Sequence, residues 1–209
     1  MTKEEYLDKL KVFQDFKFFE EDHHYEYKGE RIGISVTRLI EEYCNEFDSE
    51  TIAERVANKE NKSVQQVLDE WEYKNKFACA KGSECHYFAQ NLWNKEPFDI
   101  MKMGFDGSVE YDVACNTIQE QAIHFYEDYK ERLEHLADEF VVGSIEYNIA
   151  SAIDHLFINK LTGELVLVDY KTNSDIHKTE KYAKNMKVPL QHMKDYTLNH
   201  YYIQLSIYK

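Results

Sequence analysis

The chain has 209 residues, a formal net charge of −14 and a pI of about 5.1, and 43% of its residues are hydrophobic. These values argue against a disordered chain and against a protein that coats nucleic acid by bulk charge attraction. No apolar run approaches the ~18 residues of a membrane span, and the charged, amphipathic N-terminus does not resemble a signal peptide. We therefore expect a soluble, cytoplasmic protein without a membrane partner.

Residues 1–138 carry mainly helical patterns. Asp48 and Ser63 can each cap a helix, and Gln66, three residues after Ser63, completes a capping-box signature. Alternating aromatic residues within 23–36 predict a small β-hairpin. The expected helices are 2–13, Thr37 to about Tyr43, 49–59, one from Ser63 to about Asn94 that could break at Lys81-Gly82, and 109–136, with a connector over 95–108.

The character of the chain changes near Phe140, where the hydrophobic periodicity falls toward two and β-branched residues accumulate. A closing helix over 199–209 has Asn199 as its candidate cap. We expect strands over 139–148, 150–159 and 164–170, the last two joined by the turn "NKLTGE". This order predicts a mixed α+β (α/β) fold in a single domain, 1–209, in which a helical front half, 1–138, precedes a part with the strands, 139–209.

The stretch "LVLVDYKTN" (165–173) places an acid and a base at the end of an apolar strand. Asp169 and Lys171 project to one face of a strand that its apolar run predicts to be central and buried, where they could form a structural ion pair. Asp154, on the preceding strand, favours a different interpretation, because the hairpin brings it next to Asp169 and adjacent carboxylates need a cation or a proton between them. Oxygen ligands suit Mg²⁺ or Mn²⁺, and a nearby lysine can hold a water or a phosphate oxygen. The pattern predicts a metal site that hydrolyses a phosphodiester bond.

Around this site the sequence resembles the PD-(D/E)XK nucleases, and within them the RecB-like exonuclease branch, which includes CRISPR adaptation nucleases and mitochondrial genome-maintenance exonucleases. "GSECH" matches a Gly-x-x-x-His element of that branch, "SIEYNIASAID" carries an acid ahead of Asp154, and "QLSIY" matches a Gln-x-x-x-Tyr element. The stretch "ISVTRLIEEYCNEFD" is similar to the opening of phage-encoded members. The resemblance is tight over about 143–208 and looser over about 30–95.

The resemblance implies a restriction-endonuclease-like core, with a central mixed sheet flanked by helices, and a role for each matching residue. Asp154 and Asp169 would bind the metal with the Tyr170 carbonyl, and Lys171 would orient or activate the attacking water. The other implied residues are His86 as a metal ligand, Gln204 and Tyr208 as supports of the site or DNA contacts, and Glu146 as a ligand, a supporting group or a DNA contact. His86 could instead be an ordinary packed or surface residue, and Gln204 and Tyr208 could be the core and rim of an amphipathic helix.

The remaining cysteines and histidines predict no further metal site. The histidines other than His86 have no recognisable metal-binding spacing, and His155 is expected to point away from the face that carries Asp154. Iron–sulfur members of the branch carry cysteines after the catalytic strands, where this chain has none, so we expect no iron–sulfur cluster. Four cysteines without a CxxC pair are expected to be reduced thiols: Cys44, Cys79, Cys85 and Cys115.

Six of the lysines fall between Lys171 and Lys194. This segment could be a basic rim that contacts DNA, with Lys178 and Lys181 as substrate-binding residues, or a solvated loop. We expect a metal-dependent deoxyribonuclease using Mg²⁺ or Mn²⁺, a sequence-nonspecific exonuclease acting on DNA ends or single strands. The alternative is a non-catalytic or partner-dependent nuclease-fold subunit of a phage or mobile-element complex, which would bind a protein partner. A sequence-specific endonuclease ranks lower, because no separate recognition domain is visible.

Overall fold

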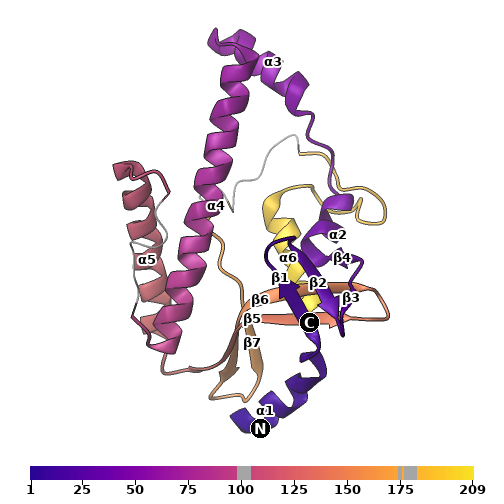
Figure 1. Ribbon diagram of the computed structural model, residues 1–209, viewed down its shortest axis with the longest axis vertical. Helices are drawn as coiled ribbons and strands as arrows, with labels where there is room; N and C mark the ends of the chain where they lie inside the picture. The colour runs from indigo at the N-terminus through magenta and orange to yellow at the C-terminus, as the bar shows by residue number, and fades with distance from the viewer. Residues whose placement is uncertain (98–104, 174–175, 177–182) are drawn as a thin grey trace. The chain divides into compact units, whose positions relative to one another are not determined.

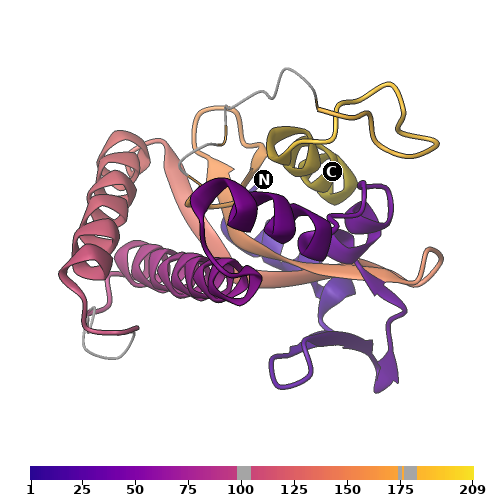
Figure 2. The same ribbon diagram turned by 90° about the horizontal axis from the view of Figure 1, so that it is seen from above.

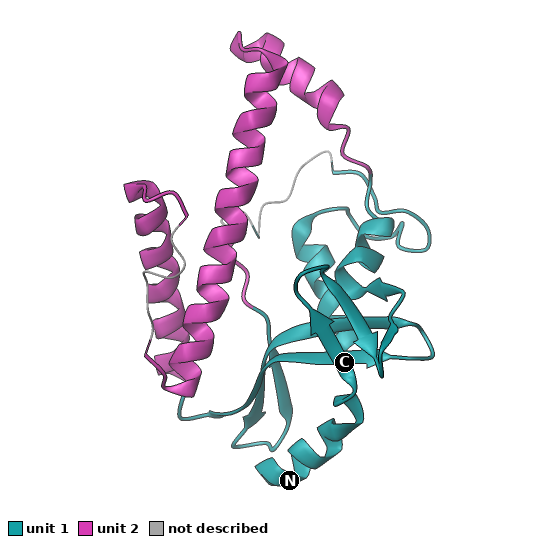
Figure 3. Ribbon diagram, in the orientation of Figure 1, with its two compact units in different colours: residues 1–45, 130–169, 173–209 teal, residues 46–129, 170–172 magenta. Residues whose placement is uncertain are grey.

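The computed structural model describes residues 1–97, 105–173, 176 and 183–209. Within these residues it contains six α-helices, a four-stranded mixed sheet with one parallel pair and a small antiparallel sheet, which confirms the mixed α+β class. None of the described helices is long and apolar enough to cross a membrane. Figure 3 colours two compact units: residues 1–45, 130–169 and 173–209 form the first, and residues 46–129 and 170–172 the second. The single domain expected over 1–209 stays a prediction.

The first unit begins with a helix and the small sheet. Lys28 and Gly29, which connect the second and third strands, both have positive φ, 51° and 85°, as a two-residue type I′ hairpin requires. This is the hairpin expected within 23–36, whereas the first strand of the sheet was not predicted. The elements are α1 (Lys3–Leu10), a 3₁₀ turn (Lys11–Phe13), β1 (Phe16–Phe19), β2 (His24–Tyr27) and β3 (Glu30–Arg31).

The main sheet of the first unit is organised around β6. This strand pairs antiparallel with β5 and β7 and parallel with β4 (Figure 1). Nine of its eleven residues are buried, all but Ala152 and Asn159, whereas β7 is only partly buried and Leu165 is exposed. The expectation that β7 is the central, buried strand is therefore wrong, because a run of four apolar residues also suits a partly covered edge strand. The strands are β4 (Ile34–Ser35), β5 (Leu133–Ser144), β6 (Ile149–Asn159) and β7 (Leu165–Val168).

The expected boundary between the long helix 109–136 and the first strand of this sheet is wrong. The helix ends at Tyr129 and β5 begins at Leu133. Leu133 falls four residues after Tyr129 and so continues the helical spacing. Leu133 is nevertheless in a strand, because it pairs with Asn159 of β6. This pairing joins residues far apart in the sequence, so the local spacing could not reveal it.

Two helix caps also differ from expectation. Ser35, not Thr37, caps α2 (Val36–Glu42), and its hydroxyl accepts a hydrogen bond from the Arg38 amide at 3.2 Å. The last helix, α6 (Thr197–Tyr208), begins two residues before the expected cap Asn199 and has no side-chain cap. Packing against α2, visible in Figure 1, replaces capping as the source of its stability.

The core of the first unit lies between the sheet and these two helices. Val36 and Ile40 of α2 pack with Ile149 of β6 and with Met186, and Ile203 of α6 lies against this cluster. Fully burying each such side chain stabilises the fold by about 1.5–3 kcal/mol. The cluster therefore holds α2 and α6 on the same part of the sheet.

The second unit is helical. Asp48 and Ser63 cap its first two helices as expected, and Ser63 forms the expected capping box with Gln66. The long helix runs through Gly82 without a break. It packs beside the third helix (Figure 2), where the ring of Trp93 contacts the rings of Phe125 and Tyr126. The helices are α3 (Ser49–Glu60), α4 (Val64–Asn94) and α5 (Val109–Tyr129).

A buried carboxyl group lies between α4 and α5. Glu84 is 2% exposed, and its Oε1 accepts a hydrogen bond from Gln119 Nε2 at 3.0 Å. Burial raises the pKa of Glu84 above its ordinary value of 4.5, although the bond from Gln119 acts in the opposite direction. The protonated form of Glu84 thus favours folding below the unfolded-state pKa, and this contribution is lost as the pH rises through the folded-state pKa.

Replacing this residue in Glu84→Gln is expected to raise the melting temperature at pH 8, because it removes a buried charge and keeps the side-chain shape. The difference from wild type should shrink as the pH falls below the raised folded-state pKa of Glu84, because its carboxyl group is then protonated in the folded protein. Each kcal/mol gained corresponds to about 2–4 °C in a chain of this length. The control is Glu72→Gln, on the same helix but 63% exposed, which should show no such pH-dependent gain in a thermal scan. A gain for Glu84→Gln that does not shrink as the pH falls would contradict the assignment.

Candidate metal centre

Three carboxylates lie in one row across the main sheet. The register of β5 and β6 places Glu139 directly opposite Asp154, because the pairs on either side of them are Asp138 with His155 and Phe140 with Ile153. The register of β6 and β7 ends with His155 opposite Val168, so the next residue, Asp169, continues it opposite Asp154. Adjacent strands are about 4.8 Å apart. Glu139, Asp154 and Asp169 therefore succeed one another on neighbouring strands, and the predicted pairing of the last two strands is confirmed.

Glu139 is the member of this row that the sequence analysis missed. One of its carboxylate oxygens lies within 4.8 Å of an oxygen of Asp154, whose residue is 8% exposed. Its φ of 42° is uncommon outside glycine, and such backbone conformations concentrate at functional sites. The signal was the register of the hairpin, since a turn over 145–148 places residue 139 opposite residue 154.

Helix α6 supports the third carboxylate. Gln204 Nε2 donates to Asp169 Oδ1 at 3.2 Å and to the Tyr208 hydroxyl at 2.7 Å. Gln204 and Tyr208 are four residues apart and so share one face of the helix. The structure thus brings these two predicted residues together with Asp169, and the amide of Gln204 restrains the carboxylate.

The Tyr208 hydroxyl also reaches the backbone of β6. It lies 2.8 Å from Ser151 Oγ and donates to the Ala152 carbonyl at 3.3 Å, while the Tyr25 hydroxyl accepts from the Ala152 amide at 3.2 Å. These contacts fall between the last residue of β6 paired with β4, Ala150, and the first paired with β7. Tyrosine hydroxyls therefore replace a neighbouring strand along this part of β6.

The variant Tyr208→Phe is expected to lower the free energy of unfolding by about 1–3 kcal/mol, because partly buried polar groups lose a hydrogen-bond partner. Urea denaturation measures this loss. The matched control is Tyr202→Phe on the same helix, where the residue is 55% exposed and little change is expected. Equal stabilities for both variants would show that the hydroxyl network around Ser151 does not stabilise the fold.

The residues that follow β7 pack in the second unit. Trp93 Nε1 donates to the Tyr170 hydroxyl at 3.3 Å, and Lys81 Nζ donates to the Thr172 carbonyl at 3.0 Å. Lys171 lies between these two anchored residues and is half-buried. His86 lies on α4, the helix that carries Lys81 and Trp93, and is also half-buried. The metal ligation expected of His86 and the Tyr170 carbonyl, and the catalytic role of Lys171, stay predictions.

The remaining predicted residues are not gathered at the row. Glu146 lies in the exposed turn between β5 and β6. The stretch of extended strand from Ile149 to Asp154 alone spans roughly 17 Å, so the structure does not bring Glu146 to Asp154. Lys178 and Lys181 lie outside the described residues.

Two of the other histidines converge in the first unit, which their spacing in the sequence did not indicate. Asp138 Oδ1 lies 2.7 Å from His135 Nε2 and 2.5 Å from His155 Nδ1. A β-bulge between His135 and Ala137 makes this possible, because the extra residue turns His135 and Asp138 to the same side of β5. His155 joins this cluster and its neighbour Asp154 joins the carboxylate row, as the alternation of side chains along a strand requires.

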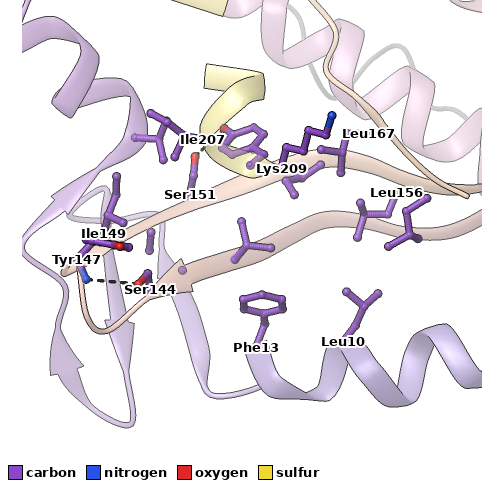
Figure 4. A pocket seen from close by; sticks show the side chains of 17 residues that line it. Leu10, Phe13, Ser144, Tyr147, Ile149, Ser151, Leu156, Leu167, Ile207 and Lys209 are labelled. Carbon is purple, nitrogen blue, oxygen red and sulfur yellow. Dashed lines mark hydrogen bonds between the residues drawn. The ribbon is translucent and has the colours of Figure 1, made fainter. Parts of the chain in front are cut away.

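A largely apolar pocket of about 460 Å³ lies elsewhere in the first unit (Figure 4). Leu10 and Phe13 line it from α1 and the turn that follows, and Ile207 lines it from α6. Lys209 is the one charged residue among its lining residues, and none of the three carboxylates of the row lines it. The candidate chemistry therefore lies at the carboxylate row and not in this pocket.

Comparisons with protein-family models, with curated proteins and with solved structures returned no match.

Proposed function

We propose that this protein is a metal-dependent nuclease that hydrolyses phosphodiester bonds in DNA. The observation that carries the proposal is the row of Glu139, Asp154 and Asp169 across three neighbouring strands. Carboxylates placed this close repel one another unless a cation or a proton separates them. Carboxylate oxygens are also the ligands that Mg²⁺ and Mn²⁺ prefer. Glu139 and Asp154, whose carboxylate oxygens lie within 4.8 Å of each other, are the ligands of such an ion in this proposal, with Asp169, which follows in the register beside Asp154, as the third.

The residues of the proposed site would bind the cation, orient its ligands and hold the attacking water or the phosphate. When bound, the cation would offset the negative charge that develops on the phosphate oxygens during hydrolysis. The burial of Asp154 strengthens its electrostatic interactions by keeping most water away. Gln204 orients Asp169 through its hydrogen bond to Oδ1. Lys171 follows Asp169 by two residues and supplies an ammonium group that can donate to the attacking water or to a phosphate oxygen.

The proposed type of nuclease rests on the order of the elements along the chain. A helix carries His86, a hairpin carries Asp154 and Asp169 with Lys171 just beyond it, and a closing helix carries Gln204 and Tyr208. This order supports a RecB-like exonuclease of the PD-(D/E)XK superfamily, built on a restriction-endonuclease-like core. The six lysines from Lys171 to Lys194, in an otherwise acidic sequence, supply positive charge that would attract the DNA phosphates.

The test is cleavage of end-labelled linear DNA, single- and double-stranded, beside covalently closed circles of the same sequence, with Mg²⁺, with Mn²⁺ and with EDTA. Metal-dependent loss of label from linear DNA, with intact circles, is the expected result. Cutting of circles would replace the exonuclease by an endonuclease. Cleavage of RNA alone would overturn the assignment of DNA as substrate.

A nuclease fold kept as a non-catalytic subunit is the competing hypothesis. It predicts no cleavage of any DNA or RNA substrate, although calorimetry still detects Mn²⁺ binding to the purified chain. It also predicts that Asp169→Ala leaves a complex with the protein partner unchanged. The presence of both Asp169 and Lys171 in the sequence argues against it, because a scaffold has no need of these two residues.

A further inference from the structure

A separate cluster of metal-ligating side chains lies where α2 ends and α6 begins. Cys44 Sγ, one carboxylate oxygen of Asp195 and one ring nitrogen of His200 all lie within 4.8 Å of one another. His200 Nε2 is 3.3 Å from Cys44 Sγ and 2.8 Å from Asp195 Oδ1. None of these residues belongs to the carboxylate row, and the nuclease mechanism uses none of them.

The arrangement differs from that of a catalytic Cys–His–Asp relay. A relay uses both ring nitrogens of the histidine, one toward the nucleophile and one toward the acid. Here the thiol and the carboxylate face the same nitrogen, His200 Nε2. That nitrogen carries at most one hydrogen, so it cannot donate fully to both partners. A cation between the three atoms could contact the sulfur, the ring nitrogen and the carboxylate oxygen at once.

The carboxylate of this cluster is held in place by its neighbours. Asp195 Oδ2 accepts from the backbone amide of Asn45 at 2.5 Å and from Asn45 Nδ2 at 2.6 Å, while Oδ1 faces His200. Although burial acts to raise it, the pKa of Asp195 is held below its ordinary value by the bonds from Asn45 and His200. Asp195 is therefore an ionised ligand in a fixed orientation, as in protein metal sites with a supporting hydrogen-bond shell.

The segment that carries Asp195 is fastened to the end of α2. The Lys187 amide donates to the Tyr43 carbonyl at 2.8 Å, and Asn45 Nδ2 donates to the Asn185 carbonyl at 2.9 Å. These bonds join residues that are far apart in the sequence but adjacent to the cluster. The three side chains thus project from supports that are themselves connected.

We propose that Cys44, Asp195 and His200 bind a single Zn²⁺ ion, with water in the fourth position. One thiolate, one imidazole and one carboxylate make a ligand set that zinc accepts in tetrahedral geometry. Zn–S of about 2.3 Å and Zn–N of about 2.0 Å place the two ligand atoms roughly 3.6 Å apart, close to the 3.3 Å between Cys44 and His200. The distance between Asp195 Oδ1 and His200 Nε2 is 2.8 Å in their hydrogen bond. It has to increase by roughly 0.5 Å when both atoms bind the ion.

The Cys44 thiol also has a contact with the backbone of α2. The Sγ hydrogen is directed at the Ile40 carbonyl, 3.3 Å away, in the last turns of α2. A bound ion would tie the end of α2 to the first turn of α6, the helix that presents Gln204 to Asp169.

The experiment measures zinc and not nuclease activity, so its outcome is independent of the proposed function. The full chain, purified with Zn²⁺ and dialysed against Mg²⁺ to keep the carboxylate row supplied, is assayed for bound zinc by plasma mass spectrometry. Cobalt substitution then reports ligation directly, because a thiolate ligand gives an intense near-ultraviolet charge-transfer band. The variants are Cys44→Ala and His200→Gln, with Cys79→Ala and His192→Gln as controls at exposed positions outside the cluster.

The expected result is one zinc per chain in wild type and in both controls, and its loss in Cys44→Ala and His200→Gln. The cobalt charge-transfer band should follow the same pattern. Zinc at a hundredfold excess over its dissociation constant should raise the melting temperature of wild type by about 5–10 °C, and that of Cys44→Ala by much less. No zinc in wild type, no charge-transfer band with cobalt, or a band retained in Cys44→Ala would each overturn the proposal. So would zinc that both Cys44→Ala and His200→Gln retain, which would place it at another site of the chain.

Discussion

Cleavage of DNA by Asp154→Asn is expected to be slower than by wild type by a factor of about 10³ or more. Asp154 is the middle carboxylate of the row and is 8% exposed, so its charge acts on a bound cation with little screening by water. Asparagine keeps the shape but removes the charge. A factor of 10³ corresponds to about 4 kcal/mol of lost transition-state stabilisation, which is the scale of a metal ion's contribution. Single-turnover cleavage of end-labelled DNA at saturating Mg²⁺ measures it.

Two companion variants make this result specific. Glu139→Gln removes the charge of the acid opposite Asp154 on β5 and should also slow cleavage. An unchanged rate would show that Glu139 is not a ligand of the ion. Asp22→Asn, at a side chain that is 71% exposed, is the control for loss of an acid from the first unit. If Asp154→Asn cleaves at the wild-type rate while wild-type activity depends on metal, the active site lies elsewhere in the protein.

The variant Phe157→Ala is expected to lower the free energy of unfolding by about 3–5 kcal/mol. It truncates the most deeply buried aromatic side chain of the main sheet. Phe157 is 0% exposed, and its ring contacts those of His135 and His155. Its removal leaves a cavity near the end of β6 that the surrounding side chains fill only in part. Urea denaturation followed by circular dichroism measures the change as a lower transition midpoint at an unchanged slope.

The control for this experiment is Leu161→Ala, in the turn after β6. Leu161 is 92% exposed, so the same kind of truncation should change the free energy of unfolding by no more than about 0.5 kcal/mol. A small effect at Phe157 as well would mean that β6 is not the core strand of the first unit.

Local signals explain which elements could be predicted from the sequence. Asp48 and Ser63 were recognised as helix caps because a cap depends on residues within one turn, and both accept the expected backbone hydrogen bonds. The turn at Lys28-Gly29 was recognisable for the same reason. Asp154 and Asp169 could be paired because a short hairpin joins their strands, so their separation along the chain determines their register.

The parts that were missed depend on contacts between distant segments. Glu139 joins the row only because β5 begins four residues after α5 ends and pairs with β6 in one register. His135 joins Asp138 through a bulge, which no simple two-residue periodicity predicts. Cys44 meets His200 through the packing of α2 against α6, across most of the length of the chain. Residue type marks such groups as candidates, but only tertiary structure shows which of them meet.

The neighbours Asp154 and His155 belong to different clusters, and each has its partner on β5. An insertion or deletion of one residue within β6 would therefore send each side chain to the wrong face and dismantle both clusters together. We expect changes of length to be tolerated best in the turns at 145–148 and 160–164, which lie outside the paired residues of β5, β6 and β7. Through evolution β6 is expected to vary by substitution and to keep its length, while related chains differ in length at its two ends.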